Sequence, residues 1–301
     1  MRVEFYLISA MEVLHFAPVA HALARMGVDV VFVSHRGAAN SLGPGYQDPD
    51  AAEELIKRLQ LRFVPIPNPN ADIAVTTNRT HVLRGYRKLR ARMNYGINLV
   101  WYNQSWARSA LFVGFDLYLF HGPFDLSIPT RYVNPKRIAF IGYPRFDAWF
   151  SRPPDPALVR KENGVGGSKP TILYLPTWEH RSSIDTFADS VFDLSERFEI
   201  LIKPHHATFV MEPERMKKVK SGPVKMLSPY MLPEEAFALA DIVISDIDSG
   251  ACWTGRRSRR RVRSGRAQLS GTRDTGAAYA KRTRFAQRAA DRRVKESGGP
   301  T

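Results

Sequence analysis

The chain has 301 residues, 44% of them hydrophobic, and is therefore long enough for two domains that each bury a core. Its formal net charge of +15 is unevenly spread, because residues 252–301 hold 15 of the 44 basic residues and 3 of the 29 acidic ones. Residues 1–251 are thus near +3, which excludes a globally basic nucleic-acid-binding protein.

The amino-terminal residues predict a β-α-β unit. Apolar runs at residues 3–8 and 28–33 flank a helical pattern over residues 13–26 that stops at Gly27. Parallel strands need such a crossover helix, so the chain opens as a Rossmann-like half, although its first turn lacks G-x-G-x-x-G. The start shows no signal-peptide pattern, and the single cysteine, Cys252, fits a reducing compartment, so we expect a cytoplasmic protein.

Alternating helices and strands continue along the first half. A helix is predicted at 51–59 and a strand at 61–65, and residues 80–106 show helical spacing, which indicates a solvated helix or an amphipathic wall or patch. Strands at 117–120 and 137–141 end in HGPFD and GYPRFD. Polar residues just past strand ends lie where open α/β sheets bind ligands.

A proline-rich stretch, SRPPDP, and a glycine-rich stretch, ENGVGGSKP, mark a boundary between lobes. A second alternation follows, with strands at 171–175, 199–202 and 241–245, a short strand near Lys225, and helices at 187–192 and 234–239. We therefore predict an α/β protein of two Rossmann-like lobes, an amino-terminal lobe over residues 1–150 and a partial second lobe over residues 151–251.

Four strand-ending motifs resemble one enzyme family. GYPRFD, ILYLPTW, LIKPHH and ADIVISDIDSG stand in the order and spacing of the CDP-glycerol glycerophosphotransferases, which build teichoic-acid-like poly(glycerol phosphate) polymers. The resemblance covers residues 118–251 and implies a glycosyltransferase-B-like fold. It also implies a CDP-activated donor, a lipid-linked or polymeric acceptor in the cell envelope, and a place at the inner face of the cell membrane.

Phosphoglycerol transfer needs groups that neutralise a pyrophosphate and a base that takes the proton of the acceptor hydroxyl. Lys203 is a candidate phosphate-binding charge, and His205, with an ordinary pKa of about 6.5, is a candidate base or phosphate ligand that the family position favours. Arg145 and Thr177 are further candidate phosphate ligands. His121, in FHGPF, resembles a family W-H-G-T element, although element order places that element near residues 95–96.

Asp246, Ser249 and Gly250 form a candidate anion site at the start of a helix, where backbone N–H groups can bind phosphate; the alternative is that Asp246 and Ser249 only cap that helix. No pair of aspartates stands at a strand end in a convincing metal-binding arrangement. We expect transfer without a metal ion or other cofactor.

Residues 252–301 are rich in Arg, Ala, Gly and Ser and poor in large aliphatic residues, so we predict a disordered basic tail. We interpret the tail as an out-of-frame translation of a GC-rich gene, which would leave the second lobe incomplete and the enzyme inactive. A genuine basic arm is the alternative.

We predict a transferase that moves glycerol phosphate, or a related polyol phosphate, from a CDP-activated donor to a cell-envelope acceptor. One alternative of similar fold is a nucleotide-sugar glycosyltransferase or a UDP-N-acetylglucosamine 2-epimerase, and another is a non-catalytic basic binding protein. Residues 84–106 are a candidate patch for an anionic membrane surface. No specific nucleic-acid partner is expected.

Overall fold

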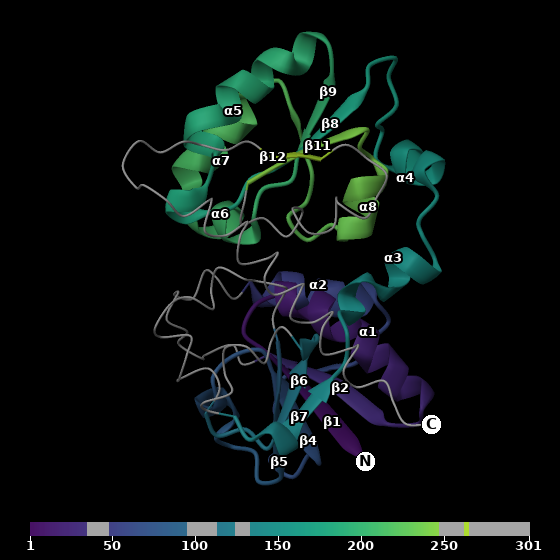
Figure 1. Ribbon diagram of the computed structural model, residues 1–301, viewed down its shortest axis with the longest axis vertical. Coiled ribbons are helices and arrows are strands. Elements are labelled where there is room, and N and C mark those ends of the chain that lie inside the picture. The colour runs from purple at the N-terminus through teal and green to yellow at the C-terminus, as the bar shows by residue number, and fades with distance from the viewer. Residues whose placement is uncertain (35–47, 95–112, 124–132, 247–261, 265–301) are drawn as a thin grey trace, which may run out of the picture. The chain divides into compact units, whose positions relative to one another are not determined.

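The computed structural model describes residues 1–34, 48–94, 113–123, 133–246 and 262–264 (Figure 1). These residues all lie in one compact unit, Met1–Gly265; a second unit, Arg266–Thr301, lies outside the described residues. The described strands form two sheets in which every strand pair is parallel.

The first sheet has seven strands in the order β3-β2-β1-β4-β5-β6-β7. The strands are β1 Arg2–Leu7, β2 Asp29–Ser34, β3 Phe63–Val64, β4 Ile73–Thr76, β5 Leu89–Met93, β6 Leu117–Phe120 and β7 Ile138–Phe140. The strand order reverses between β1 and β4. In an open parallel sheet the carboxyl ends of strands at such a point are where ligands bind.

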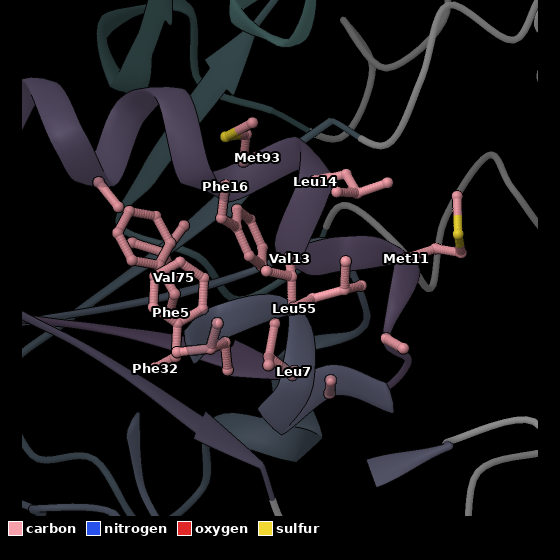
Figure 2. Packing of buried hydrophobic residues seen from close by; sticks show 14 of the residues in the cluster. Phe5, Leu7, Met11, Val13, Leu14, Phe16, Phe32, Leu55, Val75 and Met93 are labelled. Atoms are coloured by element: carbon pink, nitrogen blue, oxygen red, sulfur yellow. The ribbon is translucent and has the colours of Figure 1, made fainter. Parts of the chain in front are cut away.

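One face of this sheet packs on α1 (Met11–Arg25) and α2 (Pro49–Arg58). Three aromatic rings dominate the contact: Phe5 lies 4.9 Å from Phe16 and 5.3 Å from Phe32 between ring centroids (Figure 2). All three side chains are fully buried. Burying a phenylalanine contributes about 1.5–3 kcal/mol, so these rings fix α1 against the sheet.

The other face is covered by 3-10 turns and loops. Leu83 of η2 (Thr80–Leu83) packs in a cluster that includes Tyr6, Tyr86 and Phe120. A further turn among the described residues of this half is η6 (Pro135–Arg137), whose Arg137 side chain donates to the carbonyl of Phe115.

The second sheet has five strands in the order β10-β9-β8-β11-β12. The strands are β8 Thr171–Leu175, β9 Glu199–Ile202, β10 Lys225–Met226, β11 Ile242–Ser245 and β12 Val262–Ser264. The helices that the structure describes in this half of the chain are η7 Pro144–Phe146, α3 Asp147–Ser151, α4 Pro156–Glu162, η8 Glu179–Arg181, α5 Ile184–Phe192, η9 Asp193–Glu196, α6 His206–Met211, α7 Pro213–Ser221 and α8 Pro233–Ala238.

Successive residues of β8 point to opposite faces of the second sheet, as strand geometry requires. Leu173 packs in a cluster with residues of α4 and α8, whereas Ile172 and Tyr174 pack with residues of α5 and α7. Both faces of the sheet are therefore covered by helices, as is usual for parallel sheets.

The prediction of two Rossmann-like lobes is confirmed, and the strands expected at 117–120, 171–175 and 199–202 coincide with β6, β8 and β9. The helix expected over residues 80–106 is wrong where the structure describes it, because a 3-10 turn and then β5 stand there. Residues 95–106 lie outside the described residues.

The structure describes three residues of the predicted tail. Val262–Ser264 form β12, which pairs in parallel with β11, so these three residues belong to the second sheet. The rest of 252–301 lies outside the described residues. No helix within the described ranges is both long and apolar enough to cross a membrane.

Candidate functional site

The turn between β1 and α1 is closed by a carboxylate of the chain itself. Glu12, 3% exposed, accepts the N–H groups of Ile8 and Ser9, and the hydroxyl of Thr77 at the end of β4 donates to it as well. Burial raises the pKa of Glu12, and these hydrogen bonds oppose that rise. In a Rossmann-type dinucleotide site the N–H groups of this turn would bind a phosphate. Here the carboxylate of Glu12 takes that place.

His15 lies about one turn further along α1, where it meets Arg145 of η7. The side chain of His15 is 1% exposed, and its Nε2 lies 2.8 Å from Nη1 of Arg145. A guanidinium carries only donors, so Nε2 accepts and the ring proton of His15 lies on Nδ1. Burial, and then the charge of Arg145, lower the pKa of His15 well below its usual value. The neutral ring therefore orients Arg145.

His121 directly follows β6, and its ring contacts that of Tyr143, which follows β7. The two centroids are 4.6 Å apart with an edge-to-face angle of 78°. Burial raises the pKa of Tyr143, which keeps its hydroxyl protonated at neutral pH. His15, His121, Tyr143 and Arg145 thus gather from α1 and the carboxyl ends of β6 and β7; we call them the first-sheet cluster.

A second group of polar side chains follows β8, β9 and β11. We call it the second-sheet cluster: Thr177, Trp178, Lys203, His205, His206 and Asp246. Lys203 is partly buried, and its Nζ donates to the carbonyl of Pro229 at 2.7 Å. Burial lowers the pKa of Lys203 to about 7, and the charge of Arg145 acts in the same direction. Near neutral pH Lys203 therefore holds its proton weakly.

His205 is fixed on both sides. Its ring stacks on Trp178 with 5.7 Å between centroids and 7° between planes, and its Nδ1 accepts the N–H of Ala207 at 3.1 Å. Burial lowers the pKa of His205 well below its usual value, so the ring is neutral and carries its proton on Nε2. Nε2–H is then a hydrogen-bond donor, which suits a phosphate oxygen better than proton abstraction.

His206 lies beside His205, with ring centroids 4.4 Å apart, and is 3% exposed. Burial lowers its pKa to about 3, and the charges of Lys203 and Arg145 add to this effect. The second-sheet cluster thus holds two neutral imidazoles and a weakly protonated lysine.

Asp246, which follows β11, holds the segment after β8 in place. Its Oδ2 accepts the N–H of Thr177 at 2.5 Å and the N–H of Ser183 at 3.2 Å. Asp246 is 7% exposed and Thr177 6% exposed. Because a carboxylate repels phosphate, this geometry favours a positioning role for Asp246, and its contact with a donor stays a prediction.

Most of the site residues expected from sequence follow neighbouring strands. Thr177, Lys203, His205 and Asp246 gather in the second sheet, and His121 and Arg145 in the first. Ser249 and Gly250 lie outside the described residues.

Sequence reasoning missed Glu12, His15 and Tyr143. The available signal was the pair Glu12 and His15, two ionisable residues three positions apart in the apolar stretch MEVLHFAPVA, just after a strand.

Two parallel sheets with polar side chains at the carboxyl ends of their strands define a glycosyltransferase-B-like α/β protein, and solved structures confirm this fold. UDP-N-acetylglucosamine 2-epimerase from Neisseria meningitidis bound to UDP-GlcNAc matches with a TM-score of 0.60 at 11% identity, over 83% of this chain and 79% of that one. The wall teichoic acid polymerase TagF matches with a TM-score of 0.52 at 15% identity, over 82% of this chain and 66% of that one.

The sequence model of the family named CDP-glycerol:poly(glycerophosphate) glycerophosphotransferase matches residues 124–249. This match confirms the family resemblance predicted from the four motifs. No curated protein matches the chain. The matched segment contains Arg145 and all six residues of the second-sheet cluster.

Proposed function

We propose that this protein transfers glycerol phosphate, or a related polyol phosphate, from a CDP-activated donor to an acceptor of the cell envelope. The observation that carries the proposal is that the family match covers residues 124–249, the segment that supplies Arg145 and the whole second-sheet cluster. A lipid-linked or polymeric acceptor would bring the protein to the inner face of the cell membrane.

The second-sheet cluster suits the diphosphate of the donor. His205 offers a fixed Nε2–H donor. Lys203 can donate a proton near pH 7, because its pKa is lowered to about 7. Arg145 adds a permanent positive charge whose direction His15 controls. Preorganised donors of this kind stabilise the negative charge that develops as a phosphoryl group moves.

In the proposed reaction an acceptor hydroxyl oxygen attacks the phosphorus that carries glycerol. A new O–P bond forms, the bridging O–P bond to the nucleotide breaks, and CMP leaves with the electron pair. His121, which directly follows β6, takes the proton of the hydroxyl. Arg145 neutralises the charge of the departing phosphate.

The test is CMP release from CDP-glycerol in the presence of an oligo(glycerol phosphate) acceptor. The wild type should release CMP, and His205→Ala should lose at least about 100-fold in rate, the scale expected when a transition-state donor is removed. His180→Ala is the matched control, because His180 is an exposed histidine of η8. Equal loss in both variants would refute the role of His205.

A second candidate is a UDP-N-acetylglucosamine 2-epimerase, which the TM-score of 0.60 to such an enzyme favours at the level of fold. This candidate predicts inversion at C2 of UDP-N-acetylglucosamine with no CMP formed from CDP-glycerol. Parallel assays with the two donors separate the two functions.

A further inference from the structure

A pocket of about 360 Å³ lies on the face of the first sheet that η2 covers. Pro67 and Pro69 line one side, on the segment that leads into β4, and Val82 and Tyr86 line the other, on the segment that leads into β5. These segments enter the strands at their amino ends. The pocket is therefore separate from the first-sheet cluster, which lies at the carboxyl ends.

A single buried carboxylate joins both sides of this pocket. Glu4, which is fully buried in β1, accepts the hydroxyl of Tyr86 at 2.7 Å and the N–H of Asn68 at 3.0 Å through the same Oε2. Its other oxygen pairs with Arg2 at 2.6 Å. The pocket walls are thus held in place before any ligand arrives, which lowers the entropy cost of binding.

The rim of the pocket carries the positive charge of Arg84. Arg84 and His81 line the pocket and are exposed, and Arg84 has no acidic partner within the part of the chain that the structure describes. Two cations further along the chain are paired instead, Lys88 with Asp72 and Arg90 with Asp116. An unpaired guanidinium at the mouth of a pocket is suited to bidentate phosphate binding.

We propose that this pocket binds one phosphodiester unit of a polyol phosphate chain, as a second contact for the acceptor. The guanidinium of Arg84 binds the phosphate, while proline and tyrosine rings pack against the C–H groups of the polyol. The statement that the bound polyol phosphate is the acceptor of the reaction rests on the proposed function. Binding of the phosphodiester itself does not depend on catalysis.

The test is direct binding of a synthetic trimer of glycerol phosphate, measured by calorimetry on the full chain. Arg84→Gln should weaken binding about tenfold or more, because it removes a charge-assisted hydrogen bond. Lys161→Gln is the matched control, since Lys161 is an exposed cation of α4 in the other half of the protein; it should bind the trimer as the wild type does. Circular dichroism confirms that both variants are folded.

Equal trimer binding by Arg84→Gln and wild type would overturn the pocket proposal, whether or not CDP-glycerol is turned over. Arg84-dependent binding without any CMP release would support the pocket while contradicting the proposed function. A single-stranded oligonucleotide with the same number of phosphates should bind more weakly than the trimer. Tighter binding of the oligonucleotide would overturn the proposal in favour of a nucleic-acid site.

Discussion

Replacing Lys203 with methionine tests the electrostatics of the second-sheet cluster. Burial lowers the pKa of this lysine from 10.5 to about 7. The protonated form of Lys203 is therefore disfavoured in the folded protein, whereas the unfolded chain keeps it up to about pH 10. Methionine has a similar length and no charge. Lys203→Met should therefore be more stable than the wild type at pH 6.5, although it loses the hydrogen bond to the carbonyl of Pro229.

The size of the effect follows from the lowered pKa. A fall from 10.5 to about 7 corresponds to at most about 5 kcal/mol in the free energy of unfolding. Lys203 keeps some solvent contact, and its hydrogen bond is lost in the variant, so we expect a gain of about 2–3 kcal/mol at pH 6.5. Above pH 7 the folded wild type releases the proton while the unfolded chain retains it. Wild-type stability then rises relative to the variant by about 1.4 kcal/mol per pH unit.

Urea unfolding followed by tryptophan fluorescence between pH 6.5 and 9.5 measures this difference. The advantage of Lys203→Met should shrink steadily above pH 7 and vanish within about two units. Lys161→Met, which removes an exposed lysine, should show no such trend. A stability difference between Lys203→Met and wild type that stays constant over this pH range would refute the lowered pKa of Lys203.

Three further predictions concern the framework of the site. Glu12→Ala leaves the N–H groups of the β1–α1 turn without their carboxylate and should lower the free energy of unfolding by about 2–5 kcal/mol; a loss below about 0.5 kcal/mol in urea would contradict this. Gly222→Ala places a methyl group 2.5 Å from the ring of Phe192 and should cost about 1–3 kcal/mol, whereas Gly167→Ala meets no atom within 4 Å and should unfold at nearly the wild-type urea concentration. Arg145→Lys loses the planar fork and should slow CMP release at least about tenfold, with little change in the melting temperature.

The sequence predicts those strands whose apolar runs are continuous. Residues 171–175 and 199–202 read as buried strands and form β8 and β9 in full, because both faces of a parallel sheet are apolar. β5 was missed because the helical spacing was taken over the whole of residues 80–106, whereas its own sequence, LRARM, alternates arginine with apolar residues as a strand does. Arg92 is nevertheless buried, and its guanidinium donates to the carbonyl of Thr77.

The sequence predicted which positions form the site, but not the hydrogen bonds and protonation states of their side chains. Motif order placed Lys203 and His205 after the same strand, yet no pattern in sequence shows that Nδ1 of His205 accepts a backbone N–H or that Lys203 points at a backbone carbonyl. These contacts decide which nitrogen is a donor and how strongly a proton is held. His15 was hidden for another reason, because it fits the helical pattern and meets Arg145 only through a contact 130 residues away.

The central claim is tested most directly by following the glycerol moiety of CDP-glycerol, labelled in its carbon atoms, during incubation with an oligo(glycerol phosphate) acceptor. The account predicts that the label appears in a longer oligomer and that one CMP forms for each unit added. Label released as free glycerol phosphate, or no consumption of CDP-glycerol while UDP-N-acetylglucosamine is converted, would contradict it.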